Sequence, residues 1–255
     1  DTDLLGVLTE AFNIQGESYV LGGASASGQM AMIHAARLVQ TGVLDTAIAL
    51  GGLSDLSYWE CQGLTAIGAM AECSKEQAAE TRCRPFDQQH AGFVFGEGAA
   101  AVVIDNKSAD ALQIIIGGGV SIDANRHPNP SQAGQVKAIQ MAFSQAKIAA
   151  DDIDYINTHG TASTIGDNTE VETIKTVGCT RAKLNATKSL TGHTLSAAGV
   201  LECVASSLQM EYGFLHGTRN LNEPIDNTLN WVQQMQPKVD LKTALNLSYG
   251  FSGIN

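Results

Sequence analysis

The chain has 255 residues, of which 44% are hydrophobic and only 16% charged, so it can bury a sizeable core. Its formal net charge of −11 argues against nucleic acid as the main partner. The five cysteines show no regular spacing and no C-x-x-C pair, which favours a reducing compartment, the cytoplasm, over a disulfide framework or a cysteine zinc site. No apolar run is long enough to span a bilayer, and the start is not signal-like.

The first part of the chain alternates between helical and strand-like patterns. Apolar residues at helical spacing predict a helix over 4–12, and a strand-like run follows at 18–24. A nearly apolar pattern over 28–38 predicts a buried helix, which Gly42 ends. Residues 46–50 form a continuous apolar run, typical of a buried parallel strand. We therefore expect a right-handed strand–helix–strand crossover here.

Strand and helix patterns continue to alternate in the rest of the chain. Residues 99–104 predict a strand, and the polar segment 105–111 is the predicted domain boundary. The later patterns predict strands at 112–116, 153–157, 184–187 and 243–249, and helices at 131–149, 169–177 and 195–212. This alternation gives an α/β fold class with domains at 1–107 and 108–255.

A turn of small residues, 23–27, separates the strand-like run from the buried helix. A helix N-terminus presents free backbone N–H groups and a partial positive charge, so a residue there can hold a nucleophile or stabilise an oxyanion. Ser25 is the candidate for that role. The alternative is that Ser25 or Ser27 is only a helix N-cap, whose oxygen accepts a helix N–H.

Candidate functional residues also follow several other predicted strands. His159, Lys188, His193 and Phe251 each lie just beyond a strand, among small residues. Because ligand sites in open α/β sheets form at the carboxyl ends of strands, we expect these residues to come together. We assign the remaining histidines a structural, hydrogen-bonding role: His34, His90, His127 and His216.

Five motifs in a fixed order extend across the chain. They are Arg84-Pro85-Phe86-Asp87; Gly96-Glu97-Gly98; His159-Gly160-Thr161 with Gly166-Asp167 and Glu170; Lys188-Ser189-Leu190-Thr191-Gly192-His193 with Ala197-Ala198-Gly199; and Gly250-Phe251-Ser252-Gly253-Ile254-Asn255. Together they resemble the motifs of β-ketoacyl synthases, the condensing enzymes of the thiolase fold. The resemblance implies a thiolase-like α/β fold of two similar halves. It also implies a longer protein, because the family has a substantial segment before the nucleophile turn.

The resemblance implies catalytic roles for four residues of the second half. His159 and His193, both neutral Nε2–H donors, would hydrogen-bond the enolate oxygen that forms when a malonyl thioester loses carbon dioxide. Lys188 and Glu170 would form a supporting network around His159. This half of the family chemistry needs no thiolate.

Further residues are implied to bind the substrate. Thr161 and Ser163 match the hydroxyl pair that holds the pantetheine arm in the family, with Ser163 in place of a threonine. Phe251 matches a gating phenylalanine. The backbone N–H groups of Ser25 and Phe251 would form an oxyanion hole.

Ser25 occupies the position of the family's nucleophilic cysteine. A helix N-terminus and nearby histidines can lower a thiol pKa below its free value of about 8.5, but they cannot bring an unassisted serine to a comparable anion. Condensation should therefore be weak or absent. We predict a decarboxylase that converts malonyl-acyl carrier protein to acetyl-acyl carrier protein, most like the serine-substituted decarboxylases of polyketide β-branching cassettes.

This prediction carries expectations about cofactors and partners. No metal or organic cofactor is implied, because the phosphopantetheine arm belongs to the substrate. The expected partners are an acyl carrier protein and a second copy of the chain in a homodimer, and neither nucleic acid nor a membrane is expected.

Three alternatives stay open. The chain could be a condensing enzyme whose cysteine was engineered to serine. It could be a non-catalytic, chain-length-factor-like subunit, which the retention of both histidines and the lysine disfavours. It could also be a hydrolase or acyltransferase with a serine acyl-enzyme, although residues 23–27 end in Ser27 where the G-x-S-x-G elbow has glycine, and no acid–histidine pair stands in the expected order.

Overall fold

The computed structural model describes residues 2–53, 55–72, 78–107, 109, 111–125 and 128–255. The α-helices are α1 (Thr2–Ala11), α2 (Ser27–Gln40), α3 (Tyr58–Ala66), α4 (Gln132–Ala146), α5 (Thr164–Val177), α6 (Lys188–Thr191) and α7 (Ala198–Tyr212). Short 3-10 helices are η1 (Ala24–Ala26), η2 (Ala79–Thr81), η3 (Ala150–Asp152) and η4 (Leu195–Ala197). The strands are β1 (Thr46–Leu53), β2 (Gly98–Asp105), β3 (Tyr155–Asn157), β4 (Lys183–Asn185), β5 (Phe214–Leu215), β6 (Asn230–Trp231), β7 (Gln236–Pro237) and β8 (Ala244–Asn246).

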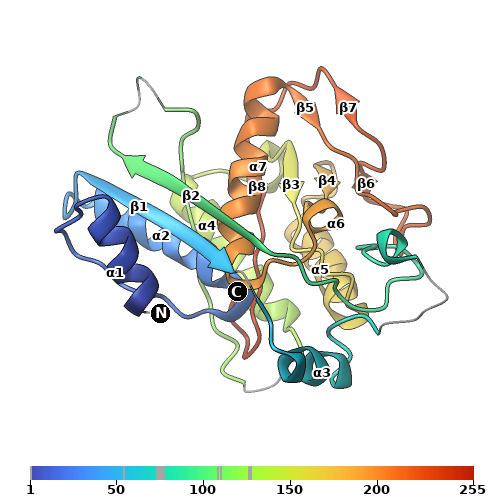
Figure 1. Cartoon of the computed structure of the whole chain (residues 1–255). Coiled ribbons are helices and arrows are strands. Elements are labelled where there is room, and N and C mark those ends of the chain that lie inside the picture. Colours follow the sequence, from blue (N-terminus) through green and yellow to red (C-terminus); the bar gives the residue numbers. More distant parts are fainter. Residues whose placement is uncertain (1, 54, 73–77, 108, 110, 126–127) are drawn as a thin grey trace.

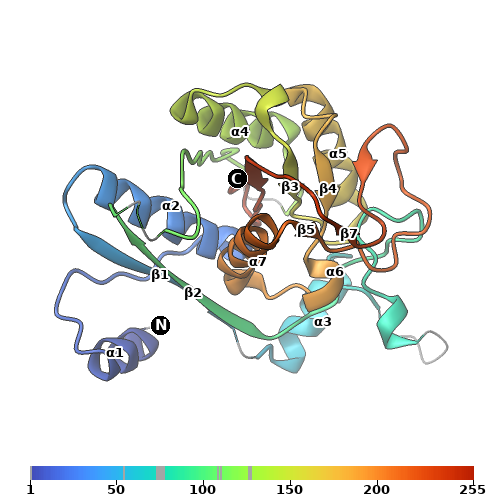
Figure 2. The same ribbon diagram turned by 90° about the horizontal axis from the view of Figure 1, so that it is seen from above.

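These elements are arranged in layers (Figures 1 and 2). The long ribbon of β1 and β2 packs on α2 and α7, α7 also contacts β8 of a second sheet, and α4 and α5 pack together. That second sheet has the order β6-β4-β3-β8 with every pairing parallel. Side chains of α4 and α5 join those of the sheet in one buried apolar cluster. The fold is the predicted α/β class, with α2 and α7 between the two sheets.

The parallel sheet forms where the sequence predicts it. The strands at 153–157, 184–187 and 243–249 correspond to β3, β4 and β8, each shortened to three residues. The helix at 131–149 ends early, because Lys147 adopts a left-handed conformation with φ of 58°. The helix at 169–177 begins five residues earlier, at Thr164 of α5.

Two predicted strands are absent from the described residues. Residues 18–24 have no regular secondary structure before η1, and residues 112–116 have none either. No strand in the described ranges pairs with either segment. A strand exists only through the ladder bonds that a neighbour supplies, so an apolar run without such a neighbour stays irregular.

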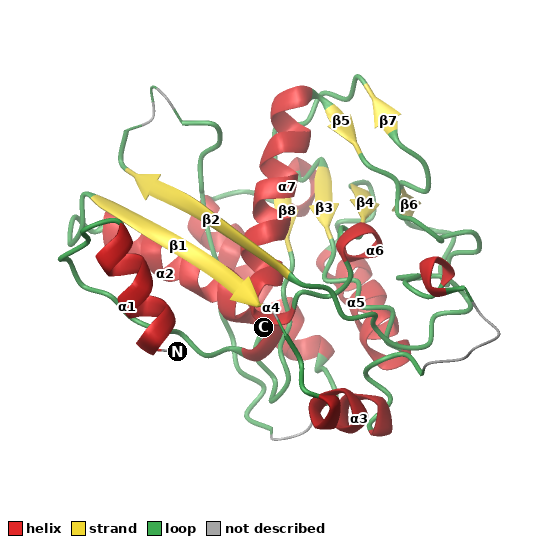
Figure 3. Cartoon of the chain, in the orientation of Figure 1, coloured by secondary structure: helices red, strands yellow, loops and turns green. Residues whose placement is uncertain are grey.

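The prediction for β1 was also wrong in part. β1 pairs with β2 in antiparallel register along its whole length, and among the described residues of the first half no parallel pair forms the expected crossover (Figure 3). One face of the ribbon packs on α2 and α7, where Ala49 is buried. The other face is open, with Ile48 52% exposed and Val103 68% exposed. A continuous apolar run predicts that both faces of a strand are buried, but it does not predict whether the neighbouring strand is parallel or antiparallel.

Two matching turns bring the halves of the chain together. In each half a 3-10 helix leads directly into a buried helix, η1 into α2 and η4 into α7. The helices cross at two glycines: a Cβ on Gly28 would lie 2.8 Å from the Ser196 carbonyl oxygen, and one on Gly199 would lie 2.5 Å from the Gln29 nitrogen. Only glycine permits this approach. The crossing therefore places the N-termini of α2 and α7 side by side.

Within the described residues, no helix is both long and apolar enough to cross a membrane. The predicted domain division at 107/108 falls in a stretch where residues 108 and 110 lie outside the described part of the chain, and it stays a prediction.

Candidate active site

Ser25 and His193 meet at the crossing of α2 and α7. The Ser25 Oγ lies 2.9 Å from the Nε2 of His193, which is buried. Ala24, just before the serine, has a positive φ of 48°, a strained conformation for alanine. Strain of this kind persists only where the surroundings impose it, and it is common at functional turns.

Neither serine of the turn is a helix cap. The N-cap of α2 is Ala26, which makes no side-chain cap bond. The Ser27 hydroxyl instead accepts from the Gly23 N–H at 2.9 Å and donates to the Ala24 carbonyl at 2.7 Å, so it closes the turn itself. The N-cap interpretation is therefore wrong for both Ser25 and Ser27.

The backbone fixes the proton position on His193. The Leu195 N–H, at the start of η4, donates to Nδ1 of His193 at 3.3 Å. Because Nδ1 is an acceptor, the neutral ring carries its hydrogen on Nε2 and donates it toward Ser25. Burial holds the pKa of His193 well below its ordinary value, and the charge of Lys188 lowers it further. His193 is thus a neutral Nε2–H donor.

His159 is held in the same form by a side chain. The ammonium of Lys188 lies 3.2 Å from Nδ1 of His159, and only the ammonium can donate in this pair. Burial, followed by the charges of Lys188 and His193, keeps the pKa of His159 well below its ordinary value. The two imidazole rings meet edge to face, with centroids 5.5 Å apart and planes at 86°. Two neutral Nε2–H groups therefore lie in one buried site.

Lys188 also binds Glu202, which the sequence analysis did not select. The Lys188 Nζ lies 2.5 Å from a Glu202 carboxylate oxygen, and both side chains are 2% exposed. Burial raises the pKa of Glu202 to about 7, while the charge and hydrogen bond of Lys188 oppose this rise. A signal for this residue does exist: Glu202 is the only charged residue in the run 195–210, and a buried charge needs a partner.

Glu170 supports His159 through its backbone. One carboxylate oxygen accepts the His159 N–H at 2.7 Å, and the other accepts the Gly160 N–H at 2.9 Å. Burial raises the pKa of Glu170 to about 8, and these two hydrogen bonds work against the increase. The carboxylate therefore fixes the loop that carries His159 and does not bond the imidazole.

The remaining predicted residues lie on segments that adjoin these groups. Thr161 and Ser163 are on the same loop as His159, with their hydroxyl oxygens 2.9 Å apart. Phe251 is 38% exposed and follows Gly250, whose added Cβ would lie 2.4 Å from the Gly23 carbonyl oxygen. The phenylalanine therefore begins a turn that packs directly against the turn of Ser25.

Two of the histidines that we assigned structural roles contact residues other than the pair of donors. His34 packs edge-on against Tyr19 with ring centroids 5.5 Å apart. The Nε2 of His216 lies 3.0 Å from the Thr187 hydroxyl. His127 lies outside the described residues.

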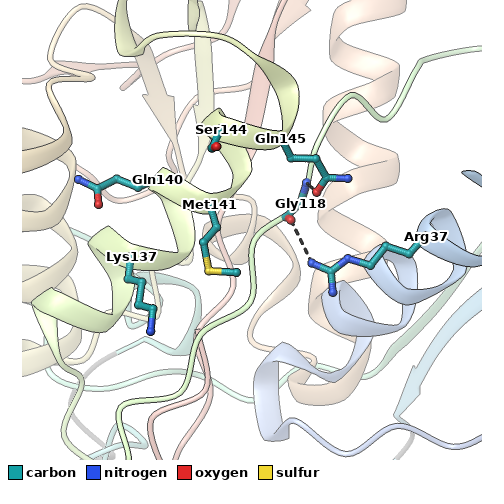
Figure 4. Close-up of a pocket in the computed structure, with 7 residues that line it drawn as sticks. All are labelled: Arg37, Gly118, Lys137, Gln140, Met141, Ser144 and Gln145. Carbon is teal, nitrogen blue, oxygen red and sulfur yellow. Dashed lines mark hydrogen bonds between the residues drawn. The ribbon is translucent and has the colours of Figure 1, made fainter. Parts of the chain in front are cut away.

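A cavity of about 470 Å³ lies elsewhere on the molecule, between α2, α4 and Gly118 (Figure 4). Its lining residues are Arg37, Gly118, Lys137, Gln140, Met141, Ser144 and Gln145. Arg37 donates to the Gly118 carbonyl at 3.2 Å across its edge. None of the predicted site residues lines this cavity, so it is separate from the candidate site.

The proton positions can be measured directly. We expect both His159 and His193 to stay neutral, as Nε2–H tautomers, from pH 8 to well below their ordinary pKa of about 6.5. Nitrogen-15 NMR of histidine-labelled protein distinguishes the two tautomers and the imidazolium. Protonation of either ring near pH 6.5, or a hydrogen on Nδ1 of His193, would contradict the geometry.

Comparisons with known proteins show the family of the chain. The model of the β-ketoacyl synthase N-terminal domain matches residues 4–110, and that of the C-terminal domain matches residues 112–222. The chain is 46% identical to the polyketide biosynthesis malonyl-ACP decarboxylase PksF of Bacillus subtilis (strain 168), over all of this chain and 63% of that protein. It is 32% identical to a 3-oxoacyl-[acyl-carrier-protein] synthase 2 of Rhizobium meliloti (strain 1021), over 98% of this chain and 62% of that protein.

A solved structure shows the same fold. A type II polyketide ketosynthase, solved in complex with its acyl-carrier protein (AntDE:AntF), superposes with a TM-score of 0.90 at 26% identity, over 98% of this chain and 64% of that one. The chain thus spans a little under two thirds of the relatives it matches. Both family domains and a thiolase-like fold are present in a single chain, which belongs to the β-ketoacyl synthase family.

Proposed function

We propose that the protein removes carbon dioxide from malonyl-acyl carrier protein to give acetyl-acyl carrier protein in polyketide biosynthesis. The observation that carries this proposal is the pair of Nε2–H donors, His159 and His193, each held in that form by a donor at Nδ1. The relative named malonyl-ACP decarboxylase supports the same reaction. The activity is assigned to the complete enzyme.

In the reaction the bond between the malonyl carboxylate and C2 breaks, and its electron pair moves into the thioester to give an enolate. The charge develops on the thioester oxygen, where His159 and His193 donate their hydrogen bonds. Such donors act without reorganisation in a buried site, and each contributes on the order of 10²–10³ in rate. Carbon dioxide leaves, and C2 takes up a proton to give the acetyl group.

Ser25 has no base in this arrangement. A serine attacks an acyl group only when a neighbour takes its proton. The nearest ring nitrogen, Nε2 of His193, already carries a hydrogen because Nδ1 accepts the Leu195 N–H. Accepting the serine proton would require a charged or rearranged imidazole, which burial disfavours. This argues for decarboxylation without acyl transfer and against the serine acyl-enzyme.

We further propose that an acyl carrier protein is the partner and that Thr161 and Ser163 bind its pantetheine arm. Their hydroxyl oxygens lie 2.9 Å apart on the loop that carries His159, and a similar ketosynthase was solved with its carrier protein. The arm would then deliver the thioester to the two histidines. No bound metal or organic cofactor is needed for these steps.

The first test follows malonyl-carrier protein and the complete enzyme together by intact-mass spectrometry. We expect acetyl-carrier protein to appear while the enzyme mass stays unchanged. Ser25→Ala should keep the decarboxylation rate within about tenfold, because one neutral hydrogen bond is lost and both donors remain. Ser25→Cys is the matched variant that restores the family nucleophile, and it should gain an acyl group.

Each other outcome points to one alternative. An acyl adduct on Ser25, with loss of turnover in Ser25→Ala, would establish a serine acyl-enzyme. No product from the wild-type enzyme, with condensation restored in Ser25→Cys, would indicate a condensing enzyme inactivated by substitution. No reaction in either variant would indicate a non-catalytic partner subunit.

We also propose a homodimer, as the family resemblance implies. Tyr19 and Val20, on the irregular segment before the serine turn, are 49% and 53% exposed and have no strand partner within the described residues. Light scattering on the complete enzyme should give twice the chain mass. A monomer at micromolar concentration would overturn this assignment.

A further inference from the structure

One histidine outside the donor pair is buried against the loop that carries the site. The Nδ1 of His90 lies 3.0 Å from Oδ2 of Asp167, and their side chains are 5% and 1% exposed. From the sequence we assigned His90 only a structural role. Asp167, however, hydrogen-bonds the backbone of the loop that carries His159.

Asp167, in the first turn of α5, accepts hydrogen bonds from three donors. Oδ2 accepts the Phe86 N–H at 2.7 Å as well as the His90 Nδ1, and Oδ1 accepts the Ala162 N–H at 3.1 Å. Because a carboxylate only accepts, the hydrogen of this contact belongs to Nδ1 of His90. His90 and Phe86 therefore fix one oxygen of Asp167, and the other oxygen is thereby aimed at residue 162.

Ala162 stands between the two proposed pantetheine ligands, Thr161 and Ser163. It is fully buried and has a positive φ of 66°, which alanine adopts only under constraint. Its N–H is held by Asp167, and its carbonyl accepts the Gly92 N–H at 2.7 Å. Both backbone polar groups of Ala162 are thus restrained through residues 86–92.

We propose that His90 is a positioning residue for the pantetheine arm, acting through Asp167 and Ala162 on the hydroxyls of Thr161 and Ser163. This inference rests on the proposed function of those two residues. Without the Nδ1–H, the carboxylate of Asp167 can turn, and the strained residue that separates the hydroxyls loses one of its restraints. The effect falls on binding of the arm. His159 is less affected, because Glu170 holds its backbone independently.

The predicted pattern is a change in KM with little change in kcat. Loss of a hydrogen bond to a buried carboxylate should weaken binding of the arm about tenfold. The amide nitrogen of asparagine can occupy the place of Nδ1, whereas that of glutamine reaches the place of Nε2. His90→Asn should therefore keep the positioning contact, and His90→Gln should lose it in a side chain of similar polarity.

The experiment uses calorimetry on the complete enzyme with holo-carrier protein, which bears the arm, and apo-carrier protein, which does not. For the wild type, His90→Asn and the control His34→Ala, the holo form should bind more tightly than the apo form by the same factor. For His90→Gln that factor should fall about tenfold, with apo binding unchanged.

The experiment measures binding and needs no turnover. A failure of the proposed role of His90 can therefore be distinguished from a failure of the proposed decarboxylase activity. A His90→Gln enzyme with the wild-type ratio of holo to apo affinity would overturn the proposal. So would equal losses in His90→Asn and His90→Gln, since those would reflect packing alone. Equal binding of holo- and apo-carrier protein by the wild type would also overturn it, because the arm would then have no site on this loop.

Discussion

Replacing His159 by alanine is expected to slow decarboxylation of malonyl-carrier protein by about 10²–10³-fold. The substitution removes one of the two Nε2–H donors that we propose to bind the enolate oxygen. It also leaves the Lys188 ammonium without the acceptor at Nδ1 that lies 3.2 Å away. The measurement is kcat for release of carbon dioxide, compared with the wild-type enzyme. His193→Ala should give a loss of similar size, since its ring supplies the second donor.

The controls separate a catalytic effect from a folding effect. His34→Ala removes a histidine that contacts Tyr19, and it should leave kcat unchanged. The double variant of His159 and His193 should lose less than the product of the single losses, because groups that act as a unit are not additive. A His159→Ala enzyme that folds normally and keeps its rate would remove the donor pair from the mechanism.

The second large effect concerns the buried pair of Lys188 and Glu202. We expect Lys188→Met to lower the free energy of unfolding by about 3–5 kcal/mol, because it leaves a buried carboxylate uncompensated. The Lys188 Nζ lies 2.5 Å from Oε1 of Glu202, and the other carboxylate oxygen, Oε2, has no hydrogen-bond partner in the described part of the chain. Urea unfolding followed by circular dichroism measures the change.

The loss in the free energy of unfolding should grow as the pH rises. Burial raises the pKa of Glu202 to about 7 with Lys188 present, so without the lysine the folded pKa should lie higher still. The folded variant then binds a proton that the unfolded chain releases above about pH 4.3. Its stability therefore falls as pH rises from about 4.3 toward the folded pKa, and the penalty should be larger at pH 8 than at pH 5.

A double substitution tests the cause of the loss. Lys188→Met with Glu202→Leu removes both charges and should recover most of the stability, since an apolar pair of similar volume replaces the ion pair. Its decarboxylation rate should stay low, because Nδ1 of His159 still lacks its donor. A double variant as unstable as the single one would attribute the loss to packing and not to charge.

The sequence predicted the strands of the parallel sheet correctly but not the two isolated apolar runs, and for a physical reason. β3 has a parallel neighbour on each side, β4 and β8, so its short apolar run becomes a strand. Residues 18–24 and 112–116 have comparable patterns, but no strand beside them in the described chain. The hydrophobic pattern of a segment indicates which side chains it can bury. Whether the segment becomes a strand depends on a neighbouring strand that can pair with it.

The site was predictable in its residues but not in its connections. Position after a strand and the family resemblance singled out His159, Lys188 and His193. The contact of His193 with Ser25 depends on how closely two helices cross, which no local pattern encodes. The backbone N–H of Leu195 that sets the tautomer is equally invisible, because every residue other than proline has such a group.

The spacing of α2 and α7 where they cross sets the relative positions of the residues in the candidate site. A methyl group on Gly28 or Gly199 would meet backbone atoms of the other half at 2.8 Å and 2.5 Å, so the two helices could not keep their spacing. A misplacement of about 1 Å can cost on the order of 10² in rate. Substitutions of the residues packed at this crossing are therefore expected to shift Ser25 relative to His159 and His193, although they lie outside the site itself. Ser25 lies in the first half of the chain and the two histidines lie in the second. Their relative positions therefore depend on how closely α2 and α7 pack.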